Sequence, residues 1–521
     1  MNKKILGSAG LTLALLVSAC GGGDGDSGSD GGTGGGGEFN IAWNAQPPSM
    51  DPAMSTSNAT RDITRNIFEP LVTLDADSEV QPVLAEDYEM AEDGASITFT
   101  LRDDVTFHDG SAMEVDDVVA SVDYWLANAN VAQEYFSGSE VSSEDDNSVT
   151  MTFAEPVHQA PTLIAHQNQF LAVMPADVIE GASAEGVEDF VGTGPYELGE
   201  WATDQHVRLD IFEDYVSPPG ESSGTAGEKN PYFDTMFFHF VGDASTRVAG
   251  MQSGEYDAAA SIPWDNAEMF EGDESVHLEV DGSGFTMPIF NKAEGVMEDQ
   301  LMREAVMAAI DPEASLQAAF ANDEYYSNNG SLLPEDSPLH VEADVELRNS
   351  QDLEAAEALL DEAGYDGEEI ELITTRDYPQ LYNVSVVLQQ QLEDLGVNTD
   401  MVVADWPTVS NEINNPEGDW DIYVDMVSWT ALPNMQGHLA PEGVGSPDDP
   451  ELSSALQEIV QSEDDEAARA AIADFQDAYY EYLPAAPIGH VTLITALGAD
   501  YEGYDFVAPS GAIYYNMRDA E

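Results

Sequence analysis

Acidic residues outnumber basic ones by 101 to 14 in this chain of 521 residues, which gives it a formal net charge of −87. The carboxylates are spread through segments with regularly spaced apolar and aromatic residues, so they indicate a folded protein with an acidic surface. In dilute buffer such a surface repels itself, whereas at about 1 M salt the Debye length falls to roughly 3 Å. We therefore interpret the charge as adaptation to a salty medium. Attraction of a cationic ligand is the alternative, but the same salt would screen it.

The net charge and the length limit the classes of protein to which the chain can belong. With only 14 Lys and Arg residues the chain cannot assemble a basic face, so no nucleic-acid partner is expected. A chain of 521 residues exceeds what one hydrophobic core organises, which predicts two or three domains. Hydrophobic residues make up 43% of the chain, enough for globular cores.

The single cysteine, Cys20, closes an apolar segment at the N-terminus. A basic start, Met1-Asn2-Lys3-Lys4, precedes the apolar residues 5–19, which end in Val17-Ser18-Ala19. This pattern resembles the lipobox of bacterial lipoproteins, whose cysteine thiol receives a diacylglyceryl group and becomes the first mature residue. The apolar segment is too short to span a bilayer comfortably and ends in small residues, as a cleaved leader does.

We therefore expect residues 1–19 to be a lipoprotein signal peptide and Cys20 to be the lipid attachment site. Residues 20–37 are almost entirely Gly, Asp and Ser after the cysteine, the composition of a flexible tether. The body of the protein would then be lipid-anchored to the cell membrane on its extracytoplasmic face, in the periplasm or at the cell surface. A lone cysteine leaves no intramolecular disulfide.

Strand and helix patterns alternate along the rest of the chain. Residues 96–101 alternate apolar and polar side chains, as a half-buried strand does, and the apolar residues of 115–126 share one helical face. Further helices are predicted over 301–310, 353–363 and 381–395, with Gly364 and Gly396 ending the last two. Strands are predicted over 397–403 and 420–426, the latter with Trp420, Ile422, Val424 and Met426 on one side. Strands interleaved with amphipathic helices indicate an α/β fold.

Several motifs occur in one order over nearly the whole chain beyond the tether. They are Trp43-Asn44-Ala45-Gln46-Pro47-Pro48-Ser49-Met50-Asp51-Pro52, Asn66-Ile67-Phe68-Glu69-Pro70-Leu71, Val105-Thr106-Phe107-His108-Asp109-Gly110, Gly192-Thr193-Gly194-Pro195-Tyr196, Gly254-Glu255-Tyr256-Asp257, Leu392-Glu393-Asp394-Leu395-Gly396-Val397 and Asp425-Met426-Val427-Ser428-Trp429. Together they resemble the extracellular solute-binding proteins of family 5, the oligopeptide and dipeptide receptors of ABC importers.

The resemblance implies a periplasmic-binding-protein-like fold with two α/β lobes, an extra subdomain in the first lobe, and a hinge between the lobes. We expect lobe I over residues 38–284, lobe II over 285–488, and a return of 489–521 to lobe I, with the crossings near 284–290 and 487–493. A cleft between such lobes can close over a peptide or a solute of similar size. The expected partners are that solute and a membrane permease, and the receptor is expected to be a monomer.

The candidate ligand-binding residues are aromatic side chains that would line the cleft and a few polar groups that would point at the solute. Trp429 ends a strand that the resemblance directs at the cleft, and the alternative is a core aromatic residue. Arg376 and Tyr378 match a segment that in some dipeptide receptors gives an arginine to the ligand carboxylate, a group that a guanidinium fork fits. A surface ion pair is the alternative for Arg376. Weaker candidates are Trp264, Trp406 and Gln46.

The chain departs from the resemblance just beyond Trp429. Peptide receptors of this family often carry an aspartate there, which holds the α-ammonium group of the ligand. This chain continues with Thr430-Ala431-Leu432-Pro433-Asn434-Met435, which contains no acid. Because a buried ammonium group without a charged partner is costly, either the solute lacks a free amino terminus or another acid takes this role.

No pattern points to catalysis, a cofactor or a metal. No two histidines have the i, i+4 spacing of a zinc helix, and no Gly-x-Ser-x-Gly elbow occurs. Asp75, Asp77, Glu79 and Glu86 imitate a calcium loop, but Val80 stands where that loop needs glycine. We therefore expect a binding protein and not an enzyme.

Other functions remain open at this point. The solute could be an oligosaccharide, an opine-like compound or a chelated metal. A surface hydrolase would require a nucleophile and base that the sequence does not display, and a structural envelope lipoprotein would show no ligand-dependent closure.

Overall fold

The computed structural model describes residues 36–520 except 271, 294, 336, 342–349, 416–417, 441–442 and 447–448. The predicted signal peptide, Cys20 and nearly all of the predicted tether therefore lie outside the described residues.

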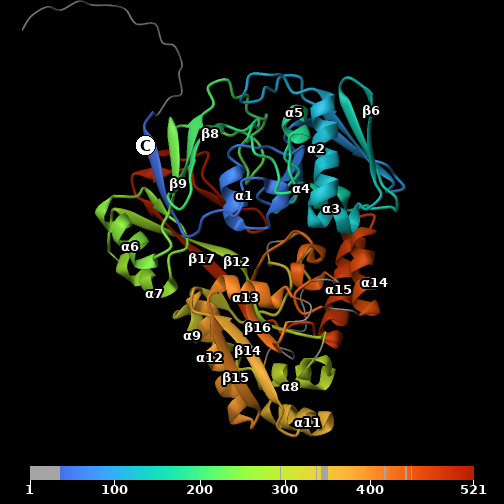
Figure 1. The fold of residues 1–521 in the computed structure, drawn as a ribbon, viewed down its shortest axis with the longest axis vertical. Helices are drawn as coiled ribbons and strands as arrows, with labels where there is room; N and C mark the ends of the chain where they lie inside the picture. The colour runs from blue at the N-terminus through green and yellow to red at the C-terminus, as the bar shows by residue number, and fades with distance from the viewer. Residues whose placement is uncertain are drawn as a thin grey trace, which may run out of the picture. The chain divides into compact units, whose positions relative to one another are not determined.

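The largest sheet runs through both lobes (Figure 1). Within the described residues it has 11 strands, in the order β15-β14-β16-β12-β17-β11-β1-β10-β9-β8, with β13 beside β17. The strands are β1 Glu38–Trp43, β8 Tyr196–Ala202, β9 His206–Ile211, β10 Thr235–Phe240, β11 Ala258–Ala259, β12 Val276–Phe290, β13 Tyr326–Ser327, β14 Glu369–Thr375, β15 Asn398–Ala404, β16 Ile422–Ser428 and β17 Gly489–Gly498.

The first lobe holds the half of this sheet from β11 to β8. β1 is parallel to β10 and β11, and β10, β9 and β8 form an antiparallel meander. The C-terminal segment adds two small antiparallel pairs, β18 Tyr501–Glu502 with β21 Arg518–Asp519, and β19 Asp505–Val507 with β20 Gly511–Ile513. The helices of this lobe are α1 Asn58–Thr64, α6 Ala244–Ser253 and α7 Trp264–Ala267.

A second sheet, in the order β4-β5-β7-β6, forms the extra subdomain of the first lobe. Its helix α2 begins with a capping box, in which Glu114 and Asp117 each bind the other's backbone N–H. The strand predicted over 96–101 and the helix predicted over 115–126 are both confirmed here. The elements are β2 Val72–Leu74, β3 Val80–Pro82, β4 Ala85–Met90, β5 Ser96–Leu101, β6 Glu140–Asp145, β7 Ser148–Thr152, α2 Val115–Asn128, α3 Asn130–Tyr135, α4 Ala160–Ala165 and α5 Ala176–Glu180.

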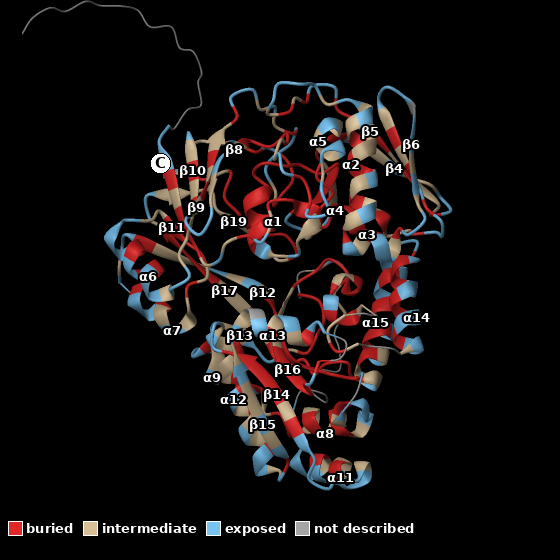
Figure 2. Cartoon of the chain, in the orientation of Figure 1, coloured by how far each residue is buried: buried red, intermediate tan, exposed pale blue. Residues whose placement is uncertain are grey.

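The second lobe is built on three parallel strands, β15, β14 and β16. Figure 2 shows buried residues along β14 and β16, the inner strands of this group. The predicted helices of this lobe are confirmed, and Gly364 and Gly396 adopt positive φ where they follow α11 and α12. The helices are α8 Gln300–Ala309, α9 Pro312–Phe320, α11 Leu353–Ala363, α12 Pro379–Asp394, α13 Trp406–Ile413, α14 Pro450–Val460 and α15 Asp465–Tyr482.

The strand predicted over 420–426 begins later than expected. β16 starts at Ile422, and Trp420 belongs to the same core cluster as Val409, while Ile422 and Val424 belong to a different one. The side-chain amide of Asn291 donates to the backbone carbonyl of Trp420 at 2.9 Å, which holds the chain in a bend before strand pairing begins. Placing Trp420 on the strand face of Ile422 was therefore wrong.

The two segments expected to cross between the lobes are neighbouring antiparallel strands. β12 pairs with β17 from Val276 to Thr286, and with β16 from Gly284 to Phe290. A Cβ atom on Gly284 would lie 1.9 Å from the carbonyl oxygen of Val427, so only glycine allows β12 and β16 to approach this closely. Gly284, at which β12 begins to pair with β16 while it still pairs with β17, therefore has to be a glycine.

Candidate solute-binding site

Four of the six predicted ligand-binding residues follow the parallel strands of the second lobe. Arg376 and Tyr378 come after β14, Trp406 comes after β15, and Trp429 comes directly after β16. Because parallel strands end at the same edge of a sheet, the fold brings these four segments to one edge. The crevice outside the carboxyl ends of parallel strands is where open α/β sheets bind ligands.

Trp429 lies at the junction of β16 with the crossing strands. Its side chain is 3% exposed, and its ring packs against Phe285 of β12 and edge-on against His490 of β17. Its backbone N–H donates to the carbonyl of Ser283 at 3.1 Å. Burial lowers the pKa of His490, whose Nε2 lies 2.9 Å from the carbonyl oxygen of Ser331. The aromatic ring therefore touches both strands that connect the lobes.

Tyr378 and Trp406 form an aromatic pair at the same edge. Their rings meet edge-on with centroids 5.3 Å apart, and Trp406 lies 6.5 Å from the ring of Tyr423 on β16. Asp377 fixes the pair, because its Oδ2 accepts the backbone N–H of Trp406 at 2.7 Å. The structure thus brings two of the predicted residues into direct contact.

Arg376 is exposed and its guanidinium group faces an aromatic ring. It lies 4.6 Å from the ring centroid of Tyr382 and donates to the hydroxyl of Tyr382 at 2.9 Å. The alternative interpretation, a surface ion pair, finds no support, since Arg376 pairs with no acid of the described chain.

Gln46 and Trp264 lie on the first lobe. The side-chain oxygen of Gln46 accepts the backbone N–H of Asp204 at 2.5 Å, an exposed contact that joins the opening loop to the β8–β9 turn. Trp264 begins α7, where its Nε1 lies 3.4 Å from the Thr492 hydroxyl and its ring stands perpendicular to Phe320. Trp264 therefore reaches the crossing strand β17, whereas Gln46 makes its contact within the first lobe.

The comparisons with known proteins agree with one another over most of the chain. Residues 79–439 match the family described as bacterial extracellular solute-binding proteins, family 5. That match covers more than half of the sequence and decides the family. This chain is a family 5 solute-binding protein.

Relatives and solved structures agree with this assignment. The probable peptide ABC transporter periplasmic-binding protein y4tO of Sinorhizobium fredii is 26% identical over 87% of this chain and 88% of its own length. A dipeptide-binding protein of Pseudoalteromonas, in complex with Met-Leu, has a TM-score of 0.79 at 22% identity and covers 93% of this chain and 100% of that one. The agropinic acid complex of AgaA from Agrobacterium tumefaciens has a TM-score of 0.79 at 21% identity, covering 93% and 99%. The two-lobe fold is therefore confirmed.

The cations of this solute-binding protein show why Arg376 stands out. Among the described residues, every other lysine and arginine meets a carboxylate or a carbonyl oxygen. Six form ion pairs, namely Arg61, Arg65, Arg102, Arg208, Lys229 and Arg518. Arg247, Lys292, Arg303 and Arg469 donate to backbone carbonyls. Arg376 is thus the one described cation whose charge is not used to hold the fold.

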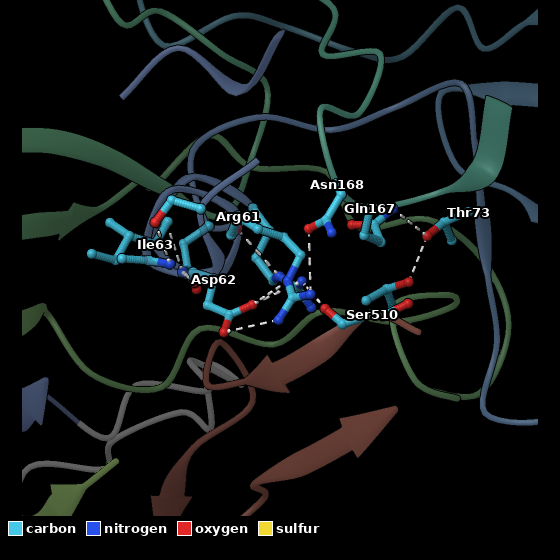
Figure 3. A network of polar contacts seen from close by, with 12 residues as sticks. Arg61, Asp62, Ile63, Thr73, Gln167, Asn168 and Ser510 are labelled. Atoms are coloured by element: carbon cyan, nitrogen blue, oxygen red, sulfur yellow. Dashed lines mark hydrogen bonds and ion pairs between the residues drawn. The ribbon is translucent and has the colours of Figure 1, made fainter. Parts of the chain in front are cut away.

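One such structural network lies in the first lobe (Figure 3). Arg61 donates to Asp62 at 2.7 Å and to Asn168 at 3.4 Å, and Arg65 donates to both Asp62 and the carbonyl of Ser510. These residues are buried except for Asn168, which is half-buried. The network connects α1 to the C-terminal segment, and the guanidinium groups of Arg61 and Arg65 already bind partners within the protein.

The reasoning from sequence missed Asp425, a partly buried carboxylate on β16. Its Oδ1 accepts the Tyr423 hydroxyl at 3.1 Å and the backbone N–H of Met426 at 2.8 Å, and burial raises its pKa. The only signal in the sequence was an acid inside the apolar run Ile422-Tyr423-Val424-Asp425-Met426, since carboxylates are otherwise uninformative in so acidic a chain.

The extra subdomain contacts the second lobe directly. The hydroxyl of Tyr135 donates to the carbonyl of Asn434 at 3.1 Å, and Gln159 donates to the carbonyls of Val460 and Ser462, both at 3.1 Å. A depression of about 550 Å³ lies elsewhere, lined by residues of the first lobe that include Asp75, Glu86, Arg102 and Glu221. The predicted ligand-binding residues are not part of its lining.

The structure was also searched for metal sites and membrane spans. Within the described residues, no group of three or more His, Cys, Asp or Glu side chains could hold a metal ion. In the calcium-like segment, Asp75 instead accepts the backbone N–H groups of Asp77 and Glu79 and closes the β2–β3 turn. None of the helices described is both long and apolar enough to cross a membrane.

Proposed function

We propose that this family 5 solute-binding protein is the receptor of an ABC importer, and that it captures peptides or solutes of similar size for a membrane permease. The observation that carries the proposal is the unpaired guanidinium group of Arg376 at the carboxyl edge of the second lobe. In a chain with 14 cations, one left free beside aromatic side chains fits a bidentate clamp for a solute carboxylate.

Two lobes with a hinge between them supply the mechanism. We assign residues 38–284 and 489–521 to lobe I and residues 285–488 to lobe II, with the extra subdomain in lobe I. Bending of β12 and β17 near Gly284 opens and closes the cleft. A bound solute adds contacts to both lobes in the closed form only, and so shifts the population toward the form that a permease reads.

Each wall of the cleft has a role in this proposal. On the second lobe, aromatic surface comes from Trp429, Tyr378 and Trp406, and Arg376 holds a carboxylate of the solute. On the first lobe, Trp264 and Gln46 contact the solute from the other side of the cleft. A peptide offers both a carboxyl terminus and apolar side chains, in keeping with the peptide transporter assignment of the Sinorhizobium relative. Binding and release require no bond to be broken, so the protein acts without catalysis, cofactor or metal.

The protein works outside the cytoplasm in this proposal, as its family's extracellular description supports. Residues 1–19 are removed as a signal peptide, Cys20 receives the lipid, and residues 20–37 tether the monomeric receptor to the outer face of the membrane beside its permease. The acidic surface keeps the protein soluble and folded in a salty medium.

The test uses the solute that the protein retains when it is purified without refolding and identified by native mass spectrometry. Calorimetry then compares an equimolar set of tripeptides with their C-terminal amides. We expect the free acids to bind the wild type at least about tenfold more tightly, a difference of about 1.4 kcal/mol.

Arg376→Ala should remove that preference, whereas Arg469→Ala, which removes an exposed arginine from α15, should keep it. A retained solute that is neither a peptide nor of similar size, together with no tripeptide binding, would contradict the proposal.

A further inference from the structure

Helix α14 ends without the glycine that ends α11. Gly364 follows α11 with positive φ, whereas Gln461 and Ser462 follow α14, and Gln461 keeps helical φ and ψ. The last carbonyl groups of a helix have no donor within it and need one from elsewhere. Gln159 of the extra subdomain supplies two donors, because its backbone N–H binds the carbonyl of Val460 and its side-chain amide binds the carbonyl of Ser462, both at 3.1 Å. The end of α14 is therefore capped by a residue of the extra subdomain.

Gln159 directs its side chain away from the helix that it begins. It stands at the N-cap of α4, where a side chain commonly accepts an N–H of its own helix, and it makes no such bond. Gln159 is half-buried, and Ala160 beside it belongs to the same hydrophobic core as Ile459 of α14. The amide of Gln159 is thus used on α14, at a contact beside buried apolar side chains of both parts.

Tyr135 of α3 makes the second contact with the same region. Its hydroxyl donates to the backbone carbonyl of Asn434, whose side-chain amide donates in turn to the carbonyl of Leu456 on α14 at 2.8 Å. Asn434 lies on the segment that follows Trp429, and Trp429 and Leu456 belong to one hydrophobic core. Both contacts therefore reach the part of the second lobe that carries Trp429, where the extra subdomain meets α14 (Figure 1).

The two contacts cross between parts that the proposed hinge motion separates. The extra subdomain belongs to lobe I along the chain, whereas α14 and Asn434 belong to lobe II. A rotation about β12 and β17 therefore changes the distance between the donor and the acceptor of each bond. A single hydrogen bond contributes modestly, but an equilibrium between two forms of similar free energy responds to the sum of three.

We propose that Gln159 and Tyr135 form a latch between the extra subdomain and the second lobe, which holds the lobes closed and opens before the solute leaves. Gln159 caps α14 from the other lobe, so the end of α14 is complete only in the closed form. This inference rests on the hinge motion of the proposed function. The latch gives the extra subdomain a part in closure, and it sets how long a solute stays bound, because release follows opening.

The test uses two latch variants and two matched controls. Gln159→Ala removes the side-chain bond to Ser462, and Tyr135→Phe removes only the hydroxyl. Gln133→Ala is the first control, since the side chain of Gln133 donates to the carbonyl of Ala127 within the extra subdomain. Tyr88→Phe is the second control, and it removes a hydroxyl from β4 of the same subdomain. Circular dichroism confirms that each protein is folded.

The first arm needs no solute. In the full-length Cys20→Ala protein, Asp123→Cys on α2 and Ser454→Cys on α14 carry spin labels at exposed positions, and electron–electron resonance gives the distances between them. We expect each latch variant to raise the ratio of the long distance to the short one by about threefold, and the controls to leave it unchanged. Equal distance distributions in the latch variants and their controls would overturn the latch, whether or not the protein binds a solute.

The second arm measures how fast the retained solute leaves, by dilution followed by mass spectrometry of the protein. Each latch variant should release it about threefold faster than the wild type, whereas Gln133→Ala and Tyr88→Phe should not. A lower melting temperature with unchanged release and unchanged distances would reduce Gln159 and Tyr135 to structural residues and overturn the latch, while the proposed function stands. A wild type that binds no peptide or solute of similar size contradicts the proposed function, and the distances alone then decide on the latch.

Discussion

The ring of Trp429 stands edge-on to the imidazole of His490, with the ring centroids 4.7 Å apart. Through this contact the end of β16, in the second lobe, packs on the strand that returns the chain to the first lobe. A solute in contact with Trp429 would therefore lie beside the crossing strands β12 and β17.

Trp429→Ala should weaken solute binding by about 2 kcal/mol or more, roughly thirtyfold in dissociation constant, because an aromatic anchor is lost. Calorimetry with the retained solute measures this. Trp201→Ala on β8 serves as the matched control. Unchanged affinity in a folded Trp429→Ala protein would show that the cleft has been misplaced.

Gly284→Ala should destabilise the fold by about 2 kcal/mol or more, because its Cβ would overlap the backbone carbonyl of Val427 and force β12 away from β16. Gly282→Ala is the control, since a Cβ at that position meets nothing within 4 Å. Urea denaturation of both variants gives the difference. Equal stability of the two would contradict the close approach of these strands.

Stability should depend on pH through His438. Burial lowers the pKa of His438 to about 3, and neither ring nitrogen has a partner among the described residues. The pKa of His438 is lower in the folded protein than in the unfolded chain, so folding favours the neutral ring. As the pH falls below about 6.5, the free energy of unfolding therefore decreases by about 1.4 kcal/mol per pH unit.

His438→Phe should remove that part of the pH dependence without destabilising the protein near neutral pH, because the ring lies edge-on to Tyr479 and neither ring nitrogen has a partner among the described residues. Chemical denaturation at several pH values compares the two proteins. Parallel stability curves for variant and wild type would refute a buried, neutral His438.

The melting temperature should rise substantially between about 0.1 M and 2 M KCl, because screening relieves the repulsion among 101 carboxylates. A melting temperature that is flat across the salt range would remove salt adaptation as the explanation of the charge.

Cys20→Ala should release the protein from the membrane fraction, because the thiol is the expected site of lipid attachment. Fractionation and immunoblotting measure this, with Ser27→Ala in the tether as a control that should stay with the membranes. If the alanine variant is processed and still sediments with membranes, the lipid anchor is not at Cys20.

The sequence predicted the elements of this fold better than their pairing. The spacing of apolar residues located α2, α8, α11 and α12, because a helix is specified by residues that are close in sequence. Gly364 and Gly396 end α11 and α12 for a similarly local reason, the positive φ that glycine adopts easily. The order of strands in the largest sheet joins segments far apart in sequence, so the sequence did not predict it, and the resemblance implied only two lobes with two crossing segments. Trp420 was misplaced because its position depends on Asn291, more than a hundred residues away.

The residues of the candidate site could be named from the sequence only in part, and their role in binding stays a prediction. Arg376, Tyr378, Trp406 and Trp429 could be named from the sequence, since each follows a predicted strand or matches a family segment. Asp425 could not, because the chain holds 101 acids and only the structure shows that Oδ1 of Asp425 has partners while Oδ2 has none among the described residues. Likewise, the free charge of Arg376 becomes evident only when every other described cation is seen to have an acceptor.

The C-terminal segment imposes an order on the assembly of the first lobe. β17 pairs with β11, Arg65 binds the carbonyl of Ser510, and Asn516 accepts the backbone N–H of Asn230. A chain that emerges N-terminus first must therefore hold β11 and α1 without these partners until residues 489–516 arrive. During that interval the second lobe can already be complete, and the first lobe is the part that a chaperone or a protease will meet unfinished.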